Sequence, residues 1–545
     1  METTRSNHRG GRIDDCLSER QGVLFIEDVP APQLVGQFGS PLFVTSEDQI
    51  RRNVRRYASA FGTAWSRRGV RVLPAAKANW SLAVQRVLAD EGCGADVYSE
   101  GELDVVLRAG VPASMISASG VPKSPAHVRR TLASGARLTV DSLEDVRCLE
   151  ACAPDLRATA SVRLRLRPAV SRFVHRSDFA HDGLIPSDVA ALTYKGGLSF
   201  EEAVEAGRRI ANLPRLRLNG FHQHHGRHSA GLAWWEAQMS AYARMIAETC
   251  RALGGMRLQD IDVGGGFAMP RDPHNAATNY GAPLTFGLLH LVSRVAVLGG
   301  PTLRYKAIRA LAGSARMTPK TRPAPTIEEY ATTVCRTLGR ELEARGIDTS
   351  GVTLEIEPGR GLLGDAGVHL TTVRAIKRQR SPLPWTVIVV DTSEFFLAAG
   401  RFERHLHQYV VANRMGAAPT MVADVVGCSC FADRLLPSVR VPDVAVGDTF
   451  AFFDTGAYQE ASAGNFNALT RPASVLVTGT QAHLCRPAET LEAVLGRERV
   501  PYHLMASRRV GTVGTIGAVG TVGPVDFVDC MDPVDPVDTV RRGLR

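Results

Sequence analysis

Short apolar runs alternate with longer amphipathic stretches through the middle of the chain. Each run ends in a polar residue or a glycine, and the stretch after it, such as 80–92 or 101–110, repeats apolar residues at helical spacing. Eight such units in succession predict a parallel (β/α)8 barrel, the TIM-barrel fold. The predicted strands lie within residues 72–79, 95–99, 115–120, 137–142, 161–168, 219–226, 259–267 and 352–360.

The pattern changes on both sides of this region. After about residue 375, strand-like runs follow one another through turns without long helices, which indicates a second, β-rich domain. The expected organisation is a disordered tail (1–20), strands that join the β domain (21–45), the barrel (46–375) with an insertion (268–326), the β domain (376–505) and a low-complexity disordered tail (506–545). The insertion is a candidate lid or oligomer contact.

Functional groups gather where the predicted strands end, which is the catalytic face of a barrel. The run that ends in Lys77 is of most interest, because the chain has only six lysines among 64 basic residues. A lysine amine kept partly neutral by its surroundings forms a Schiff base with a carbonyl substrate or with pyridoxal phosphate, which arginine does not do. The alternative is a lysine whose amine simply reaches solvent.

Three further motifs end predicted strands. The glycines at 264–266 let backbone N–H groups approach an anion such as a phosphate, unless they form only a tight turn. At the eighth strand, Arg360 is a candidate phosphate clamp, and Glu357 is a carboxylate suited to keep a pyridine nitrogen protonated. In HQHHG, an imidazole suits stacking on a cofactor ring; no carboxylate spacing supports a metal site there.

Taken in order, these motifs match a known pattern: AAKAN, GADVYSEGE, FHQHHG, DVGGGF, EPGR, GAY and FN. The chain resembles the pyridoxal-phosphate decarboxylases of the alanine-racemase-like fold, the group that contains diaminopimelate, ornithine and arginine decarboxylases. The resemblance covers about residues 38–480. It implies a barrel with a β domain, a pyridoxal 5'-phosphate cofactor, an amino-acid substrate of the basic or diamino type, and a homodimer with shared active sites.

The same resemblance implies roles for individual residues. Lys77 would hold the cofactor as an aldimine, His224 would stack on its ring and Glu357 would pair with its nitrogen. The remaining supporting or cofactor-binding residues would be Asp96, Glu102, Arg165, Gly264, Gly265, Gly266, Gly359, Arg360 and Tyr458. From the partner subunit, Cys430 would lie near the reacting carbon, with Cys428 as second choice, and Asp433 would contact the substrate.

Two features depart from the family pattern. Arg227 stands where the family has a phosphate-binding serine. The loop from Cys430 to Asp433 is one residue shorter than usual, and Phe431 replaces the glutamate with which diaminopimelate decarboxylases read the distal end of their substrate. The identity of the substrate therefore stays open among routes to lysine, a polyamine or a secondary metabolite.

Two other functions are alternatives to decarboxylation. A racemase or epimerase on the same fold would set an arginine against the ring nitrogen, so Glu357 counts against it. A decarboxylase-like binding protein without turnover is the second, and the presence of Lys77, Glu357 and Arg360 counts against that one.

Composition excludes several classes of protein. The net charge of +9 comes from dispersed arginines without a basic patch interleaved with aromatics, so we expect no nucleic-acid partner. No apolar run approaches the length of a membrane span, and the first twenty residues lack an apolar signal core, which predicts no membrane association and a cytoplasmic location. The ten cysteines are scattered, which indicates neither a disulfide framework nor a metal site.

Overall fold

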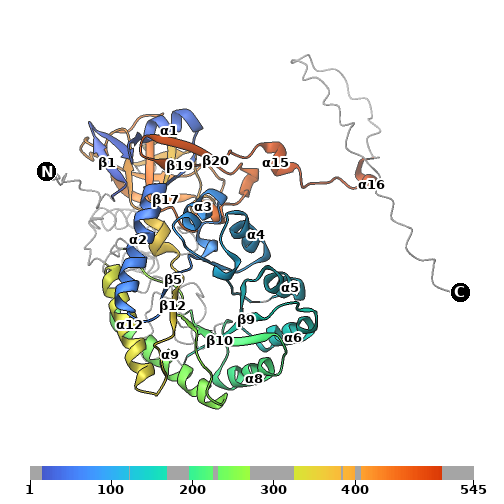
Figure 1. Cartoon of the computed structure of the whole chain (residues 1–545). Helices are drawn as coiled ribbons and strands as arrows, with labels where there is room; N and C mark the ends of the chain where they lie inside the picture. Colours follow the sequence, from blue (N-terminus) through green and yellow to red (C-terminus); the bar gives the residue numbers. More distant parts are fainter. Residues whose placement is uncertain are drawn as a thin grey trace, which may run out of the picture. The chain divides into compact units, whose positions relative to one another are not determined.

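An eight-stranded parallel sheet forms the first large element of the computed structural model (Figure 1). The structure describes residues 15–121, 123–168, 195–224, 231–269, 324–381, 384–398 and 407–505. Arg227, residues 1–14, residues 270–323 of the predicted insertion and the predicted tail 506–545 lie outside this set. The eight strands are β5 (Gly69–Val72), β6 (Ala95–Val97), β7 (Ile116–Ala118), β8 (Arg137–Val140), β9 (Ala160–Arg165), β10 (Leu216–His222), β11 (Asp260–Asp262) and β12 (Thr353–Ile356).

The sheet runs in the order β5-β12-β11-β10-β9-β8-β7-β6 and returns to its start. Between its first and last strands, Gly94 N–H donates to Val72 O at 2.9 Å and Asp96 N–H donates to Pro74 O at 3.1 Å. Every predicted run overlaps one of these strands, although β5, β9 and β10 begin before their runs and β5 shares only Val72 with its run. The predicted (β/α)8 barrel is therefore confirmed, with the seam between β5 and β6 made of these two backbone bonds.

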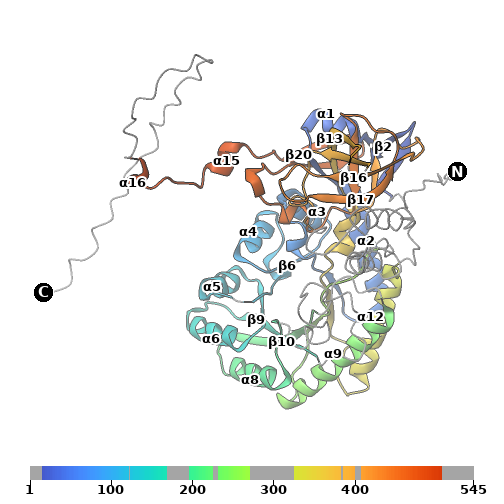
Figure 2. The same ribbon diagram turned by 180° about the vertical axis from the view of Figure 1, so that it is seen from behind.

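Helices surround this ring of strands in both views (Figures 1 and 2). They are α2 (Glu47–Ala64), α3 (Leu82–Asp90), α4 (Glu100–Arg108), α5 (Pro125–Ser134), α6 (Leu143–Cys152), α8 (Phe200–Ala211), α9 (Leu232–Ala252) and α12 (Ile327–Glu343). Hydroxyl caps set where several begin: the Ser199 and Thr326 side chains each accept from the third helical N–H, and a glutamate at that position reaches back to the cap. Each helix then buries one apolar face against the strands.

The predicted β-rich domain is also present. Its nine-stranded sheet follows the order β17-β16-β14-β13-β4-β19-β20, with β18 joining β13 to β15. The strands are β4 (Leu42–Ser46), β13 (Gly367–Gln379), β14 (Trp385–Val390), β15 (Tyr409–Val411), β16 (Met421–Val426), β17 (Arg434–Val441), β18 (Thr449–Phe453), β19 (Ala473–Thr478) and β20 (Gln481–Arg486). The early strand β4 lies antiparallel to β13 and parallel to β19, so the chain starts this sheet before it builds the barrel.

Two boundaries differ from those expected. Strand β13 begins at Gly367, inside the range assigned to the barrel, and follows α13 (Arg360–Leu363) after one short turn. Residues 17–20, expected to be disordered, form β1 (Leu17–Arg20), which pairs antiparallel with β2 (Val23–Ile26). Burial explains this order, because Cys16 is only 2% and Leu17 only 6% exposed.

The short sheet of β1, β2 and β3 (Val29–Pro30) is followed by α1 (Ala31–Phe38). It is tied to the β domain by Leu24 N–H, which donates to Ala412 O at 2.7 Å. The chain divides into two units, Met1–Val494 and Leu495–Arg545, and the described part of the second contains α16 (Tyr502–Met505). None of the described helices combines the length and apolar character that crossing a membrane requires.

Candidate active site

Lys77 lies in a single 3-10 turn, Ala76–Ala78, shortly after β5. Its neighbours Ala76 and Ala78 are buried, whereas the Lys77 side chain is 39% exposed. Its Nζ lies 3.2 Å from Oδ2 of Asp96, which is buried at the second position of β6. The amine is therefore paired with Asp96, and the side chain that carries it is partly exposed.

The charge on Lys77 differs from the expectation of a partly neutral amine. Burial lowers the pKa of Lys77, but the neighbouring Asp96, Tyr458 and Glu357 outweigh it, and the pKa is raised above its ordinary value. Asp96 in turn is ionised: burial raises its pKa, but the Lys77 ammonium and the Ser119 hydroxyl bring it below the ordinary value. In this arrangement the buried carboxylate of Asp96 stabilises the ammonium form of Lys77.

Glu102 of the GADVYSEGE motif and Arg165 of β9 support the segments around Lys77. Glu102 in α4 accepts from Tyr98 N–H at 2.6 Å and so caps the helix that follows β6. Arg165, the last residue of β9, donates to Asp141 at 2.8 Å and to the His224 backbone oxygen at 3.3 Å. Arg165 thus holds the segment that carries His224.

The glycine loop after β11 packs between His224 and the end of β12. Gly265 N–H donates to His224 Nδ1 at 3.1 Å, which fixes the orientation of the ring. A Cβ on Gly265 would lie 2.1 Å from the Glu357 backbone oxygen, so no larger residue fits there. Gly264 and Gly266 have φ of +71° and +94°, which favour glycine. The close approach of the loop is thus a consequence of its sequence.

Tyr458, from a loop of the β domain, meets the EPGR motif and the lysine turn. A Cβ on Gly359 would lie 2.5 Å from the Tyr458 hydroxyl, and the Arg360 guanidinium lies 4.9 Å from the centre of the Tyr458 ring. Tyr458 N–H donates to Ala78 O at 2.7 Å. The structure therefore brings together, within one chain, the predicted residues Lys77, Asp96, Arg165, His224, Gly264, Gly265, Gly266, Glu357, Gly359, Arg360 and Tyr458.

Below these residues, the interior of the barrel is charged. The most buried member is Arg163 of β9, whose side chain is 0% exposed. Its guanidinium donates to Asp262 at 2.7 Å and to Glu355 at 2.5 Å, and lies 3.8 Å from Glu357. Arg137 of β8 donates to Glu355 at 2.7 Å and to Asp260 at 3.0 Å. Each of these two guanidinium groups is therefore paired with carboxyl groups, which offsets the cost of burying its charge.

Sequence reasoning did not identify this interior network. The signal was present: charged residues recur two positions apart at 163 and 165, at 260 and 262, and at 355 and 357, and Arg137 is followed two positions later by the polar Thr139. Alternate residues of a strand face the same side, so a charged pair two apart predicts a polar interior. The apolar residues between them concealed the pattern.

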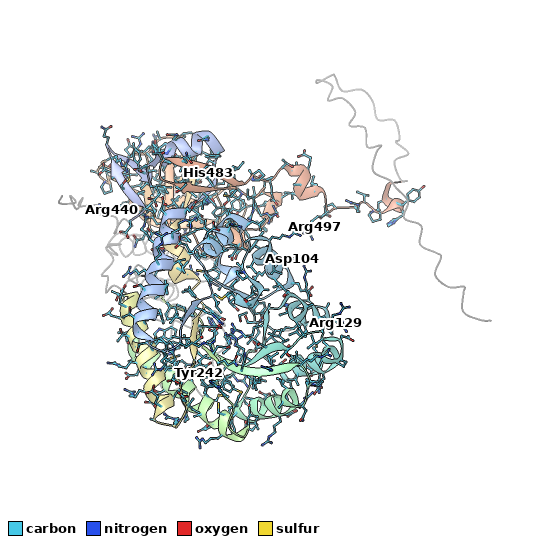
Figure 3. All side chains as sticks on the ribbon, viewed as in Figure 1. Asp104, Arg129, Tyr242, Arg440, His483 and Arg497 are labelled. Carbon is cyan, nitrogen blue, oxygen red and sulfur yellow. The ribbon has the colours of Figure 1, made fainter. Side chains whose placement is uncertain are left out.

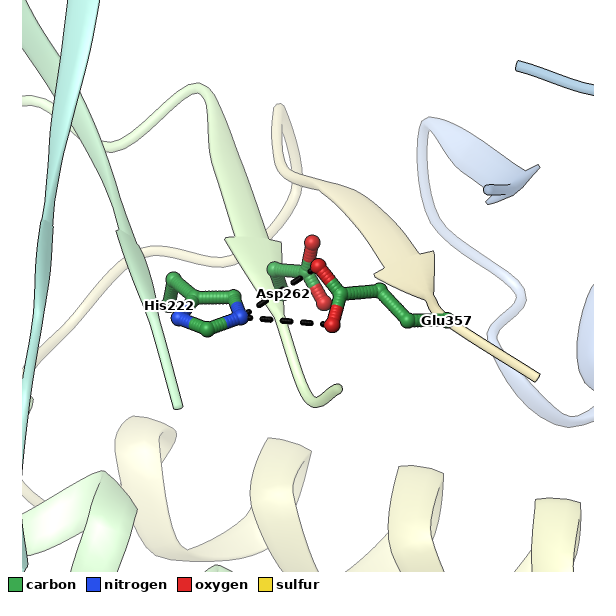
Figure 4. A group of neighbouring side chains, drawn as sticks. All are labelled: His222, Asp262 and Glu357. Carbon is green, nitrogen blue, oxygen red and sulfur yellow. Dashed lines mark hydrogen bonds and ion pairs between the residues drawn. The ribbon is translucent and has the colours of Figure 1, made fainter. Parts of the chain in front are cut away.

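At the top of the network, His222, Asp262 and Glu357 point toward one another from three adjacent strand ends (Figure 4). His222 Nε2 lies 3.3 Å from the Glu357 carboxyl group. Burial lowers the pKa of His222 to about 3, so the ring is neutral. The hydroxyl of Tyr242, which Figure 3 labels on α9, donates to the Asp262 backbone oxygen at 3.1 Å.

The carboxyl groups of this network divide into two kinds. Burial raises the pKa of Glu355, but Arg137 and Arg163 outweigh it and lower the value to about 2. For Glu357, burial and then the charge of Asp96 raise the pKa, and for Asp262 burial and the charge of Glu357 do the same.

The ligand atoms of His222, Asp262 and Glu357 lie within 4.8 Å of one another, but Arg163 already supplies the positive charge that a metal would bring, so we assign no metal.

The loop of Cys430 lies in the β domain, after β16. Cys430 is exposed; its N–H donates to Asn467 at 2.8 Å and its sulfur accepts from the Asn467 amide at 3.2 Å. The Cys428 thiol, the second choice, donates to Asp391 O at 3.4 Å. Asp433 is 1% exposed, and its two carboxylate oxygens accept backbone N–H groups of Glu394 and Ser429. Through these bonds Asp433 holds the loop, and its predicted contact with the substrate stays a prediction.

Two exposed aromatic residues adjoin Cys430 and its partner Asn467 in the sequence. Phe431 is 46% and Phe466 39% exposed. Phe395 stacks on Phe466 with ring centres 4.2 Å apart and meets Phe431 edge-on at 6.1 Å. The exposed thiol is therefore part of an apolar surface, and the position of Phe431 carries no charge toward a ligand.

Known proteins share both sequence and fold with this chain. A family model described as "Pyridoxal-dependent decarboxylase, pyridoxal binding domain" matches residues 47–284. The diaminopimelate decarboxylase of Actinosynnema pretiosum is 31% identical over 483 residues, covering 88% of this chain and 93% of that protein. That of Archaeoglobus fulgidus is 28% identical over 491 residues, covering 90% of this chain and 100% of that protein.

Solved structures agree with the sequence comparison. The diaminopimelate decarboxylase of M. jannaschii, in complex with L-lysine, has a TM-score of 0.74 and 25% identity, and the alignment covers 90% of this chain and 99% of that chain. A lysine/ornithine decarboxylase from Vibrio vulnificus, in complex with putrescine, has a TM-score of 0.60 at 19% identity, covers 82% of this chain and 97% of that one, and supports the fold alone.

Proposed function

The chain belongs to the pyridoxal-phosphate-dependent decarboxylases that act on amino acids, and from this premise we propose that Lys77 carries the cofactor and that the substrate is a basic or diamino acid. The observation that supports this most is the convergence of Lys77, the glycine loop, Glu357, Arg360 and Tyr458 around one accessible amine.

The residues fit such a cofactor. A phosphate needs backbone N–H groups and a cation. The turn Gly264–Gly266, whose first two N–H groups donate to Asp262 and His224 in this structure, lies beside the segment that carries Arg360. A flat pyridine ring needs a stacking partner, and Gly265 N–H and Arg165 fix the His224 segment for that purpose. A ring nitrogen needs a carboxyl partner, which is Glu357 at the mouth of the buried network.

The chemistry follows from these positions. Bound pyridoxal phosphate supplies an electron sink that accepts the electron pair left when carbon dioxide departs. Lys77 provides the amine for attachment, and Asp96, 3.2 Å away, holds the proton of its ammonium form. Glu357 fixes the protonation of the ring nitrogen, while buried Arg163 keeps Glu357 and Asp262 in place.

Carbon dioxide release from a panel of basic and diamino acids, in both configurations at the α-carbon, tests this proposal. We expect turnover with at least one member, and a loss on the order of 10³-fold or more in Lys77→Ala. Lys377→Ala, which changes an exposed lysine on β13, is the matched control and should keep full activity. A chain that binds the cofactor but inverts the α-carbon without releasing carbon dioxide would show a racemase instead.

We further propose that the functional form is a homodimer in which Cys430 of one protomer completes the site of the other. The exposed thiol and the exposed rings of Phe431 and Phe466 form an apolar surface that a second copy would bury. If the sites are shared, mixing equal amounts of inactive Lys77→Ala and Cys430→Ala chains restores about a quarter of the wild-type activity. About half of the dimers are then mixed, and half of the sites in a mixed dimer are intact. No recovery on mixing, with both chains folded and exchanging, contradicts shared sites.

We also propose a cytoplasmic location. All nine described cysteines are free thiols, and Cys428 and Cys430 are exposed, which suits a reducing compartment. Fractionation of cells that express the full chain tests this, and recovery outside the cytoplasmic fraction contradicts it.

A further inference from the structure

The buried carboxyl groups of Asp262 and Glu357 face each other from adjacent strand ends (Figure 4). Their ligand oxygens lie within 4.8 Å of each other, yet a carboxylate has no donor to offer. The other contacts of Asp262 come from donors: Gly264 N–H at 2.8 Å and Arg163 at 2.7 Å. Glu357 Oε1 has no hydrogen-bond donor among the described residues. A proton between the two groups would satisfy both.

Charge balance points to the same number of protons. Among the described residues of this network, four buried carboxyl groups face three guanidinium groups, of which two are buried and that of Arg71 is 35% exposed. These are Asp260, Asp262, Glu355 and Glu357 against Arg71, Arg137 and Arg163. Lys77 pairs with Asp96 and Arg165 pairs with Asp141, so neither adds to the balance. One negative charge is left over, and a buried unpaired charge is costly unless the group takes up a proton.

The position of that proton follows from the contacts. Glu355 interacts with all three arginines and is the group that they keep ionised. Glu357 has Arg163 only at 3.8 Å, and it also faces Asp96 of β6, Asp262 of β11, neutral His222 of β10 and the Lys77 ammonium. The excess proton is therefore best placed at the contact between Glu357 and Asp262.

We propose that Asp262 and Glu357 share one proton in the folded chain, and that Asp262 is a positioning residue that keeps Glu357 protonated at the place where the cofactor's ring nitrogen binds. The ring nitrogen then meets a hydrogen-bond donor when it enters the site. Asp262 acts only through Glu357, since its own oxygens face Gly264 and Arg163. The inference rests on the proposed function only for the identity of the group that Glu357 meets.

Infrared pH-difference spectra of the full-length chain, recorded before and after addition of pyridoxal phosphate, test the shared proton directly. Without added cofactor, we expect the carbonyl band of a protonated buried carboxyl group at neutral pH, and its loss as the solution becomes alkaline. Asp262→Asn should shift this loss to lower pH, because an amide N–H stabilises the ionised form of Glu357. Glu357→Gln should remove the band altogether.

Asp141→Asn is the matched control, because Asp141 is equally buried at the end of β8 but is ionised. Burial raises its pKa, yet Arg165 outweighs it and lowers the value. This variant should keep the band. Absence of the band from the wild type, or an unchanged band in Glu357→Gln, would overturn the proposal. If Asp262→Asn fails to fold, the infrared spectrum of Glu357→Gln still tests the proposal. A chain that shows the band but decarboxylates nothing refutes the proposed function and leaves the shared proton intact.

Discussion

The interior of the barrel and the core of the β domain are built on opposite principles. Inside the ring of strands, the space that branched apolar residues usually fill holds Arg137, Arg163, Asp260, Asp262 and Glu355, all 7% exposed or less. One core cluster of the β domain is built of apolar side chains, among them Ile388, Val425, Leu436 and Phe450. The β-domain core needs only shape and burial to hold together. The barrel interior needs each charge to have its partner, and it places the unbalanced one directly beneath the candidate active site.

Arg163→Met breaks this contrast most strongly. The substitution keeps much of the volume but leaves Asp262 and Glu355 without their shared cation, and breaking a buried ion pair costs about 3–5 kcal/mol. Denaturant unfolding should show a loss of this size in the free energy of unfolding. Arg163→Lys keeps a charge but makes fewer hydrogen bonds, so its free energy of unfolding should lie between those of the wild type and Arg163→Met. A loss below about 1 kcal/mol in Arg163→Met would show that the network does not depend on its central cation.

Leu436→Ala tests the other principle. Leu436 is fully buried in β17, and its truncation should cost about 2–5 kcal/mol through lost burial and a cavity. Because no titrating group lies in this apolar cluster, the loss should be the same at about pH 6 and about pH 8. Unfolding curves at the two pH values measure this. A loss that changes by more than about 1 kcal/mol between them would mean that the two regions are electrostatically coupled.

Glu357→Gln isolates the pH dependence of the barrel. Burial and Asp96 raise the pKa of Glu357 from 4.5 to about 8, so the folded chain holds a proton that the unfolded chain releases. Its contribution to stability is complete below the unfolded pKa and is lost as pH rises through the folded one. Wild type should therefore lose stability between about pH 5 and about pH 8, and Glu357→Gln should lose less. Parallel pH profiles of the melting temperature would contradict this.

These contrasts also explain what the sequence could and could not predict. The barrel, the β domain and the convergence of Lys77, His224, Glu357 and Arg360 were predictable, because strand ends of a parallel barrel must meet at one face. The protonation state of Lys77 was not, because it depends on the distance to Asp96. The loop-holding bonds of Asp433 were not predictable either, since a motif position does not show that its oxygens bind backbone N–H groups. The partners of Arg163 on β11 and β12 are long-range contacts that only the register of the sheet brings together.

An ion pair of the same type on the outside of the barrel should contribute least to the free energy of unfolding. Arg56 of α2 donates to Glu328 of α12 at 3.0 Å, but the side chains are 48% and 54% exposed. Solvent screens such a pair, so Arg56→Ala should change the free energy of unfolding by about 0.5 kcal/mol or less, and less still in high salt. Denaturant unfolding of Arg56→Ala and Arg163→Met under the same conditions measures the two losses of stability. A cost at Arg56 comparable to that at Arg163 would mean that burial is not what makes the interior pairs important, and the contrast between the barrel interior and the rest of the molecule would then need another cause.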